Sequence, residues 1–320
     1  MVLRAVARSV PATSVPVMRR VAIAAVVAQA GISVTGSVVR VTGSGLGCPT
    51  WPECFPGSLV PTPHPEIAAI TQWIEFGNRL LTFVVVLVAG VALLAALNTR
   101  PRRARLTRLA LIQPLSVVAQ AVIGGIVVQL ELVWWSVSVH FAVSMVAVWL
   151  AMLLVDAAGD GDGPPRRVVN GPVRGLVTTS TAVLAALLVA GMLLTAAGPH
   201  AGDSATPRLD IGVPQLAQLH ADLLFAYLGL LVGLGFALRA VAAPTRLLRR
   251  YGMLVAIVLA QGALGGIQYA LGVPEVLVSL HVLGAALVTI GAAALWSGTT
   301  VRPALHALVE PGAELATART

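Results

Sequence analysis

Long apolar runs, separated by short polar segments, make up most of the sequence. Eight of these runs have the roughly 20 apolar residues that a helix needs to cross the hydrocarbon core of a bilayer. They lie at residues 19–40, 69–97, 107–130, 134–155, 173–197, 213–240, 247–271 and 275–298. Pro114 and the glycine pairs inside the runs are compatible with helices that pack against one another in a membrane. We therefore predict an all-α integral membrane protein with eight transmembrane helices.

The composition supports the same prediction. Hydrophobic residues make up 57% of the 320 residues and charged residues only 11%, whereas charged residues make up about 25% of a typical soluble domain. The net charge of +8 could suggest a nucleic-acid partner, but all 21 basic residues are arginines in short segments between apolar runs. A membrane protein explains that distribution better, so we expect a lipid bilayer around the chain and no nucleic acid.

The arginines also predict the orientation of the helices. Eighteen of the 21 lie in the N-terminal segment, in the connections 98–108, 156–174 and 239–250, and in the C-terminal segment. Because basic residues collect on the cytoplasmic side, we expect a plasma-membrane protein with both termini in the cytoplasm. The first 17 residues lack the apolar core of a signal peptide and are expected to be a cytoplasmic lead-in.

The chain contains an internal repeat. AQAVIGGIVVQLELVWWSVSVH at 119–140 and AQGALGGIQYALGVPEVLVSLH at 260–281 share Ala-Gln, Gly-Gly-Ile and a final His without a gap. We therefore expect two pseudo-symmetric four-helix bundles in the same orientation, joined by a flexible linker that contains the run GDGDGPP. The expected segments are an N-terminal half at 1–156, a cytoplasmic linker at 157–171, a C-terminal half at 172–300 and a cytoplasmic tail at 301–320.

The only two cysteines, Cys48 and Cys54, lie in the loop TGSGLGCPTWPECFPG at 42–57. The orientation above places this loop outside the cytoplasm, where disulfides persist. We expect the two thiols to form a disulfide that holds the loop as a lid over the outer ends of the helices. Two reduced thiols, or a pair that passes electrons, remain alternatives.

Three histidines, His140, His220 and His281, lie within predicted spans. Each is about six or seven residues from the outer end of its helix, which corresponds to a depth of about 10 Å. Histidines on facing helices at matched depth are suited to axial ligation of a haem. Zinc is less favoured because these histidines have too few other ligands nearby. The simpler alternative is that each imidazole is a buried, hydrogen-bonded side chain.

Glu75 is the other ionisable residue whose burial in a membrane is costly. It lies three residues before Asn78, which places both on one helix face, and it could act as an acid or base or pair with Arg79. Alignment of the two halves places Asn78 on His220 but gives Glu75 no acidic counterpart. The pattern indicates a reaction half followed by a cofactor half.

Two outer arginines, Arg40 and Arg79, could bind the propionates of a haem. They could equally extend to lipid headgroups. Asp222 is interpreted as a supporting or solvated group without a catalytic role.

These residues resemble those of the haem A synthase family. The resemblance rests on GSVVRVTGSGLGCPTWPEC, on EFGNR in the second helix and on one His in each of helices four, six and eight. It implies oxidation of the C8 methyl of haem O to a formyl group, which gives haem A for cytochrome oxidase. It implies haem b bound between His220 and His281, and substrate haem O near His140 with Glu75 as the essential carboxylate. Cys48 and Cys54 would be the family's outer-loop pair.

The sequence departs from this family at Asn78, where members commonly have His. An amide is a poor ligand for haem iron, so we expect His140 alone to hold the substrate haem, with activity retained. The resemblance also implies a haem O synthase and cytochrome oxidase assembly factors as partners, and it allows a homo-oligomer.

Two other functions remain open. A membrane cytochrome b that transfers electrons from quinol would need a histidine pair in each half, which Asn78 does not provide. A transporter would be consistent with the parallel repeat, but its polar residues usually lie at breaks in helices near the middle of the membrane.

Overall fold

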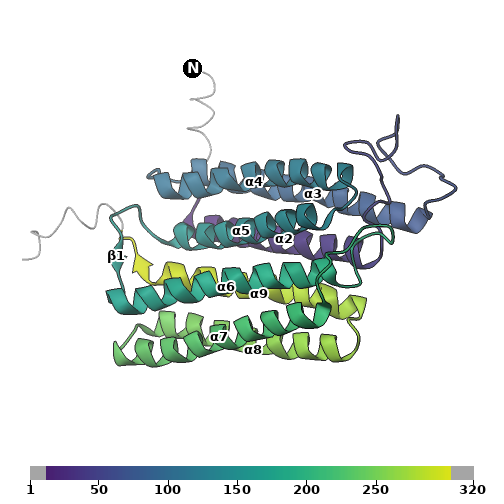
Figure 1. The fold of residues 1–320 in the computed structure, drawn as a ribbon. Helices are drawn as coiled ribbons and strands as arrows, with labels where there is room; N and C mark the ends of the chain where they lie inside the picture. Colours follow the sequence, from purple (N-terminus) through teal and green to yellow (C-terminus); the bar gives the residue numbers. More distant parts are fainter. Residues whose placement is uncertain (1–11, 304–320) are drawn as a thin grey trace, which may run out of the picture.

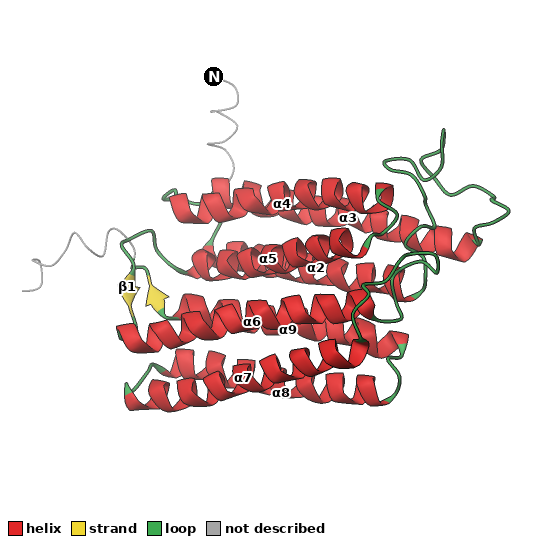
Figure 2. Cartoon of the chain, in the orientation of Figure 1, coloured by secondary structure: helices red, strands yellow, loops and turns green. Residues whose placement is uncertain are grey.

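The computed structural model describes residues 12–303 and is helical over most of that range (Figures 1 and 2). The predicted features at residues 1–11 and 304–320, including Arg4, Arg8 and Arg319, lie outside the described residues. The elements in chain order are α2 (Val15–Val41), α3 (Ala69–Leu97), α4 (Ala104–Gln129), α5 (Trp134–Gly159), β1 (Arg166–Arg167), α6 (Gly171–Ala197), α7 (Val213–Ala240), α8 (Thr245–Ala270), α9 (Glu275–Gly298) and β2 (Thr300–Val301).

The eight described helices are each long and apolar enough to span a membrane, which confirms the predicted fold class. The bounds of α3, α7 and α9 coincide with the predicted spans. Helices α2, α6 and α7 begin with a proline in their first turn, where its fixed φ favours the helix. Asn170 caps α6 by accepting a hydrogen bond from the Val173 amide at 3.1 Å.

Each half of the chain forms a four-helix bundle with one helix at each of four corners (Figure 1). In the first half, α3 and α5 each pack against both α2 and α4, so they occupy opposite corners. In the second half, α6 packs closely with α7 and α8 with α9, and smaller contacts join the two pairs. Helices α7 and α9 therefore occupy the corners that correspond to α3 and α5.

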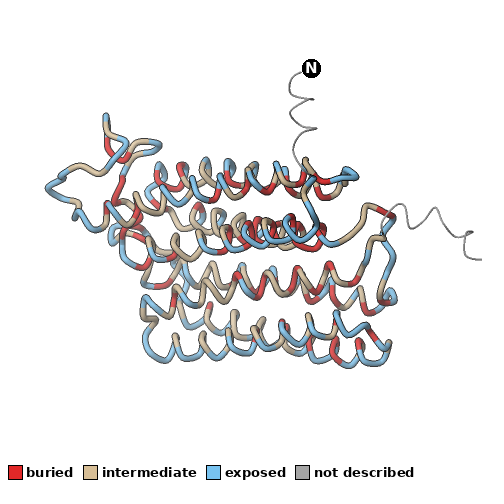
Figure 3. Tube along the Cα trace, turned by 180° about the vertical axis from the view of Figure 1, so that it is seen from behind, coloured by how far each residue is buried: buried red, intermediate tan, exposed pale blue. Residues whose placement is uncertain are grey.

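The two halves meet through α9, which packs against α2 and α5. A small buried cluster of Ala30, Met145, Val148 and Ala286 fills this contact. Away from the contact, much of the molecule is exposed or half-buried (Figure 3), and large apolar side chains such as Phe83, Phe225 and Phe236 point outward. Such an apolar surface is expected for helices that face lipid.

One end of the bundle carries the long connection 42–68, and we call it the loop end (Figure 1). At the opposite end, called the linker end, a buried carboxylate connects the two halves. Asp156 of α5 accepts hydrogen bonds from Arg250 of α8, at 2.9 Å for one pair of atoms, and from Ser297 of α9. Asp156 and Ser297 are equivalent positions of the repeat, so the two halves join at matching sites.

The linker between the halves is more ordered than the Gly/Asp/Pro composition predicts. Its residues Arg166 and Arg167 pair antiparallel with Val301 and Thr300. The Gly161 amide also donates to the Arg302 carbonyl at 2.8 Å. The sequence could not indicate this because the partners lie beyond the last helix, more than 130 residues away.

Candidate functional site

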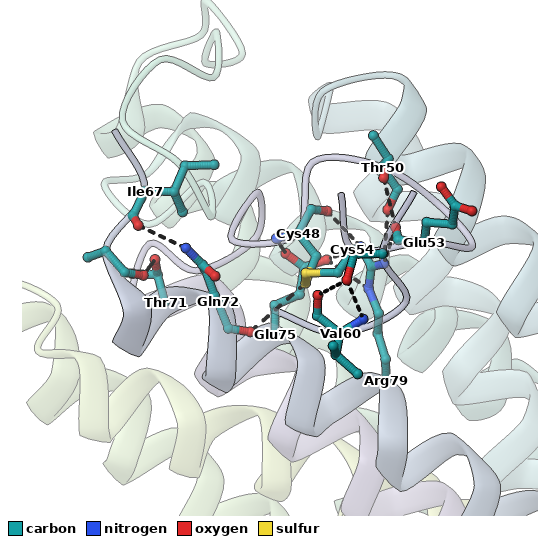
Figure 4. The surroundings of a disulfide bond; sticks show 12 residues. Cys48, Thr50, Glu53, Cys54, Val60, Ile67, Thr71, Gln72, Glu75 and Arg79 are labelled. Carbon is teal, nitrogen blue, oxygen red and sulfur yellow. Dashed lines mark hydrogen bonds and ion pairs between the residues drawn. A yellow bond between two sulfur atoms is a disulfide. The ribbon is translucent and has the colours of Figure 1, made fainter. Parts of the chain in front are cut away.

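The connection 42–68 folds back over the loop-end terminus of α3 (Figure 4). Cys48 and Cys54 form a disulfide, as predicted, and both side chains are fully buried. Phe55 packs with the disulfide, and Ile67 and Phe76 lie against this cluster. The disulfide therefore closes a small ring within the loop, and this ring packs against Phe76 of α3.

Glu75 lies beneath this loop and is only 5% exposed. One carboxylate oxygen accepts a hydrogen bond from the Cys48 amide at 2.7 Å, and the other accepts from Arg79 Nε at 3.1 Å. Residues four apart share a helix face, so α3 presents Glu75 and Arg79 together. The buried carboxylate is thus held between Arg79 of α3 and the connection 42–68, which we call the disulfide loop.

Arg79 also anchors the loop. Its terminal nitrogens donate to the carbonyl oxygens of Cys48 at 2.7 Å, Thr50 at 2.9 Å and Glu53 at 3.2 Å. Together with Glu75, these acceptors engage the whole guanidinium group, which has five N–H donors in a fixed fork. In this structure Arg79 is therefore a partner of the loop.

Two glycines allow the loop to approach the helices closely. A Cβ at Gly47 would lie 2.4 Å from the Thr71 carbonyl oxygen at the start of α3. A Cβ at Gly125 of α4 would lie 2.6 Å from the indole ring of Trp51, which belongs to the loop. Side chains larger than hydrogen at these positions would displace the loop.

The imidazoles of His220 and His281 face one another across the second half. Their ring centroids are 6.4 Å apart and their planes are inclined by 56°. Glycines leave space beside them, because a Cβ at Gly191 or Gly265 would lie 3.0 Å or 2.9 Å from a ring carbon. Sequence reasoning did not identify Gly191, which has no motif around it.

These two histidines fit a haem iron. Their Nδ1 atoms are buried within the protein, which leaves Nε2 as the ring nitrogen that could bind a metal. A metal–imidazole bond of about 2 Å on each side is compatible with one metal ion between rings at this separation. No group of three or more His, Cys, Asp or Glu suitable for a metal ion occurs among the described residues, so a zinc-type ligand set is not formed there.

His140 has the same local surroundings in the first half. Gln120 donates to the His140 carbonyl at 3.4 Å, as Gln261 does to the His281 carbonyl at 2.8 Å. Gly124 lies beside the His140 ring, and the His140 Nδ1 is buried without a partner in the described part of the chain. The repeat seen in the sequence therefore extends to the hydrogen bonds around each histidine.

Asn78 occupies the place that corresponds to His220, but its side chain is turned toward another helix. Its carbonyl oxygen accepts a hydrogen bond from the Thr35 hydroxyl of α2 at 2.7 Å. Arg40, the remaining predicted site residue, donates to the His200 carbonyl at 2.6 Å.

Comparison with known proteins identifies the family of the chain. The model of a family described as cytochrome oxidase assembly protein matches residues 19–205, more than half of the chain. The chain is also similar to haem A synthases of several bacteria. That of Geobacillus thermodenitrificans is 32% identical over 122 residues, which are 38% of this chain and 37% of that protein.

The haem A synthase of Lysinibacillus sphaericus is 32% identical over 139 residues, 42% of each chain. That of Symbiobacterium thermophilum is 33% identical over 131 residues, 40% of each chain. The aligned part thus spans about two fifths of the length of these relatives. With the family match covering both Glu75 and His140, the chain belongs to the haem A synthase family of cytochrome oxidase assembly proteins.

Proposed function

We propose that this membrane protein is a haem A synthase, which oxidises the C8 methyl of haem O to a formyl group and so supplies haem A to cytochrome oxidase. Family membership and the names of the relatives support this proposal. The observation that carries it is the Glu75 carboxylate, buried beneath the disulfide loop and held by Arg79 and the Cys48 amide. Family membership also favours a synthase over the membrane cytochrome b and the transporter.

The two halves would bind different haems. Residues 1–156 would bind haem O, with His140 on its iron, and residues 172–300 would bind haem b between His220 and His281. The short linker 157–171 joins them. Bound haem b would supply one-electron transfer. The Asn78–Thr35 hydrogen bond supports a substrate site with a single histidine ligand.

The reaction would consist of two successive two-electron oxidations of one methyl carbon. Counted with oxygen at the level of water, R–CH3 + H2O gives R–CH2OH + 2 H+ + 2 e−, and R–CH2OH + H2O gives R–CH(OH)2 + 2 H+ + 2 e−. The gem-diol loses water to give the aldehyde, and the four electrons would pass to an external one-electron acceptor in the membrane. Each oxidation releases protons from the substrate. Glu75 would accept them as a general base, a role that typically contributes a factor of about 10²–10⁴ to the rate. The loop held by Arg79 would keep bulk water away from the reacting carbon.

Replacement of Glu75 tests this function. Glu75→Ala should leave haem O in place of haem A, with at least about a hundredfold loss of conversion, measured by chromatography of haems extracted from cells that depend on this chain. Glu66→Ala is the matched control because Glu66 is an exposed carboxylate in the connection 42–68, just before α3. Normal haem A in the Glu75→Ala cells would overturn the assignment.

We also propose that the loop end faces outward from the plasma membrane and that both termini are cytoplasmic, as the arginine distribution indicates. Because Cys48 and Cys54 are the only cysteines, a membrane-impermeant maleimide can test this orientation. After reduction of the disulfide, the reagent should label this chain in intact cells. Labelling of the chain only after lysis would indicate the opposite orientation. A haem O synthase and oxidase assembly factors are the proposed partners, and self-association is compatible with the exposed apolar helices.

A further inference from the structure

Two arginines from different segments lie next to each other where the two halves meet at the loop end. Arg40 belongs to the last turn of α2, and Arg208 belongs to the connection 198–212 between α6 and α7. Arg40 donates to the His200 carbonyl at 2.6 Å, and Arg208 donates to the Pro199 carbonyl. Because these acceptors are consecutive in the chain, the two guanidinium groups share one small region.

No carboxylate in the described part of the chain forms an ion pair with either of these two cations. Each ion pair among the described residues involves Arg79, Arg105, Arg246 or Arg250, so neither Arg40 nor Arg208 has a carboxylate within 4.0 Å there. Arg208 Nη1 is buried and has no hydrogen-bond partner within the described range. An unpaired buried donor on a charged group is unfavourable, and two neighbouring like charges add to the cost.

The surroundings hold this region in place from several directions. His200 Nε2 lies 2.9 Å from the Val273 carbonyl oxygen, which ties the connection to the turn before α9. The Gly45 amide donates to the Gly202 carbonyl at 2.8 Å, which ties it to the disulfide loop. The connection that accepts hydrogen bonds from both arginines is therefore held by backbone groups of both halves.

We infer that Arg40 and Arg208 together form a binding site for an oxyanion, with the carboxylate of a porphyrin propionate as its ligand. Guanidinium groups bind carboxylate and phosphate through paired hydrogen bonds. The three candidate ligand histidines lie about two turns from the starts of α5, α7 and α9 at this same end, so a bound porphyrin could extend its propionates toward the two arginines. This choice of ligand rests on the proposed function; the phosphate of a lipid headgroup is the other source of the same chemistry.

The test uses the purified full chain, produced without haem, and compares its uptake of haem b with that of haem b dimethyl ester, whose propionates carry no charge. Arg40→Gln and Arg208→Gln are compared with the charge-retaining Arg208→Lys and with Arg239→Gln, a control at the exposed linker end of α7. Phospholipid phosphate bound per chain is measured on the same samples.

We expect the wild type to prefer haem b over its ester by on the order of tenfold. Each Gln variant should lose this preference, while Arg208→Lys keeps part of it and Arg239→Gln keeps all of it. If the preference persists in the variants but bound phosphate falls, the site holds a lipid headgroup. If neither quantity changes, the inference is wrong. If the wild type takes up neither porphyrin, the proposed function itself is contradicted. In that case, a fall in bound phosphate in the Gln variants would still show that the two arginines bind an oxyanion, and unchanged phosphate would show that they do not.

Discussion

At the scale of single residues, the placement of Glu75 depends on groups on both sides of it. A buried carboxylate is stable only when it is paired and hydrogen-bonded, and Arg79 and the Cys48 amide provide those interactions. The four-residue spacing on α3 made the Glu75–Arg79 pair predictable from sequence. The Cys48 contact could not be predicted, because it depends on how the loop folds back onto the helix.

Replacement of Arg79 should therefore affect the loop as well as the carboxylate. Arg79→Gln removes the ion pair and most of the hydrogen bonds to the loop carbonyls. We expect haem A formation to fall at least about tenfold, since hydrogen bonds to charged groups contribute about 1.5–3 kcal/mol each. The disulfide should also become easier to reduce, as measured by the rate of thiol release with a water-soluble phosphine. Unchanged reduction of the disulfide would show that Arg79 does not anchor the loop.

Gly125 provides a second residue-scale test with a control from within the repeat. Gly125→Ala places a methyl group against Trp51, whereas Gly266→Ala at the equivalent position of the second half meets open space. We expect Gly125→Ala to expose the loop to proteolysis and to lower haem A formation severalfold. Gly266→Ala should resemble the wild type in both measurements. Equal behaviour of the two variants would contradict the packing of Trp51 on α4.

At the scale of helices and loops, the sequence predicts the helices well and their partners poorly. The apolar runs define all eight helices, and the bounds of α3, α7 and α9 match the predicted ones, because membrane thickness and turn residues determine where such helices end. Contacts such as Trp51 with Gly125, or Arg40 with the connection 198–212, join segments far apart in the sequence. No local pattern carries that information.

The histidine pair of α7 and α9 allows a test at this scale. His220→Ala or His281→Ala should remove most of the haem b from the purified protein, since each ring would provide one of two axial ligands. The measurement is the pyridine haemochrome content per chain, with circular dichroism to show that the helices persist. His64→Ala is the control, because His64 lies in the 42–68 connection and stacks on Phe55. Full haem b content in both α7 and α9 variants would contradict the assignment.

At the scale of the whole molecule, a buried ion pair connects the two halves. Asp156 and Arg250 lie at the linker end, with side chains that are 7% and 16% exposed. Removal of one partner from a buried pair typically costs about 3–5 kcal/mol, whereas removal of both costs much less. This contact was absent from the sequence prediction because Asp156 and Arg250 lie in different halves.

Asp156→Ala should therefore lower the thermal unfolding temperature of the purified protein clearly, and Asp156→Leu combined with Arg250→Met should recover most of the loss. Arg246→Ala should have little effect, because the Arg246 side chain is 65% exposed. The measurement is thermal unfolding in detergent. A double variant less stable than Asp156→Ala would show that the pair does not act as a unit.

The central claim is that haem O is oxidised beneath the disulfide loop by a protein that retains a second haem. The most direct measurement is chromatography of haems from a cell that makes haem O but no haem A, before and after it expresses this chain. The account predicts that haem A appears with the wild type and that haem O alone persists with Glu75→Ala. Membranes that contain the intact wild-type chain and only haem O would contradict it.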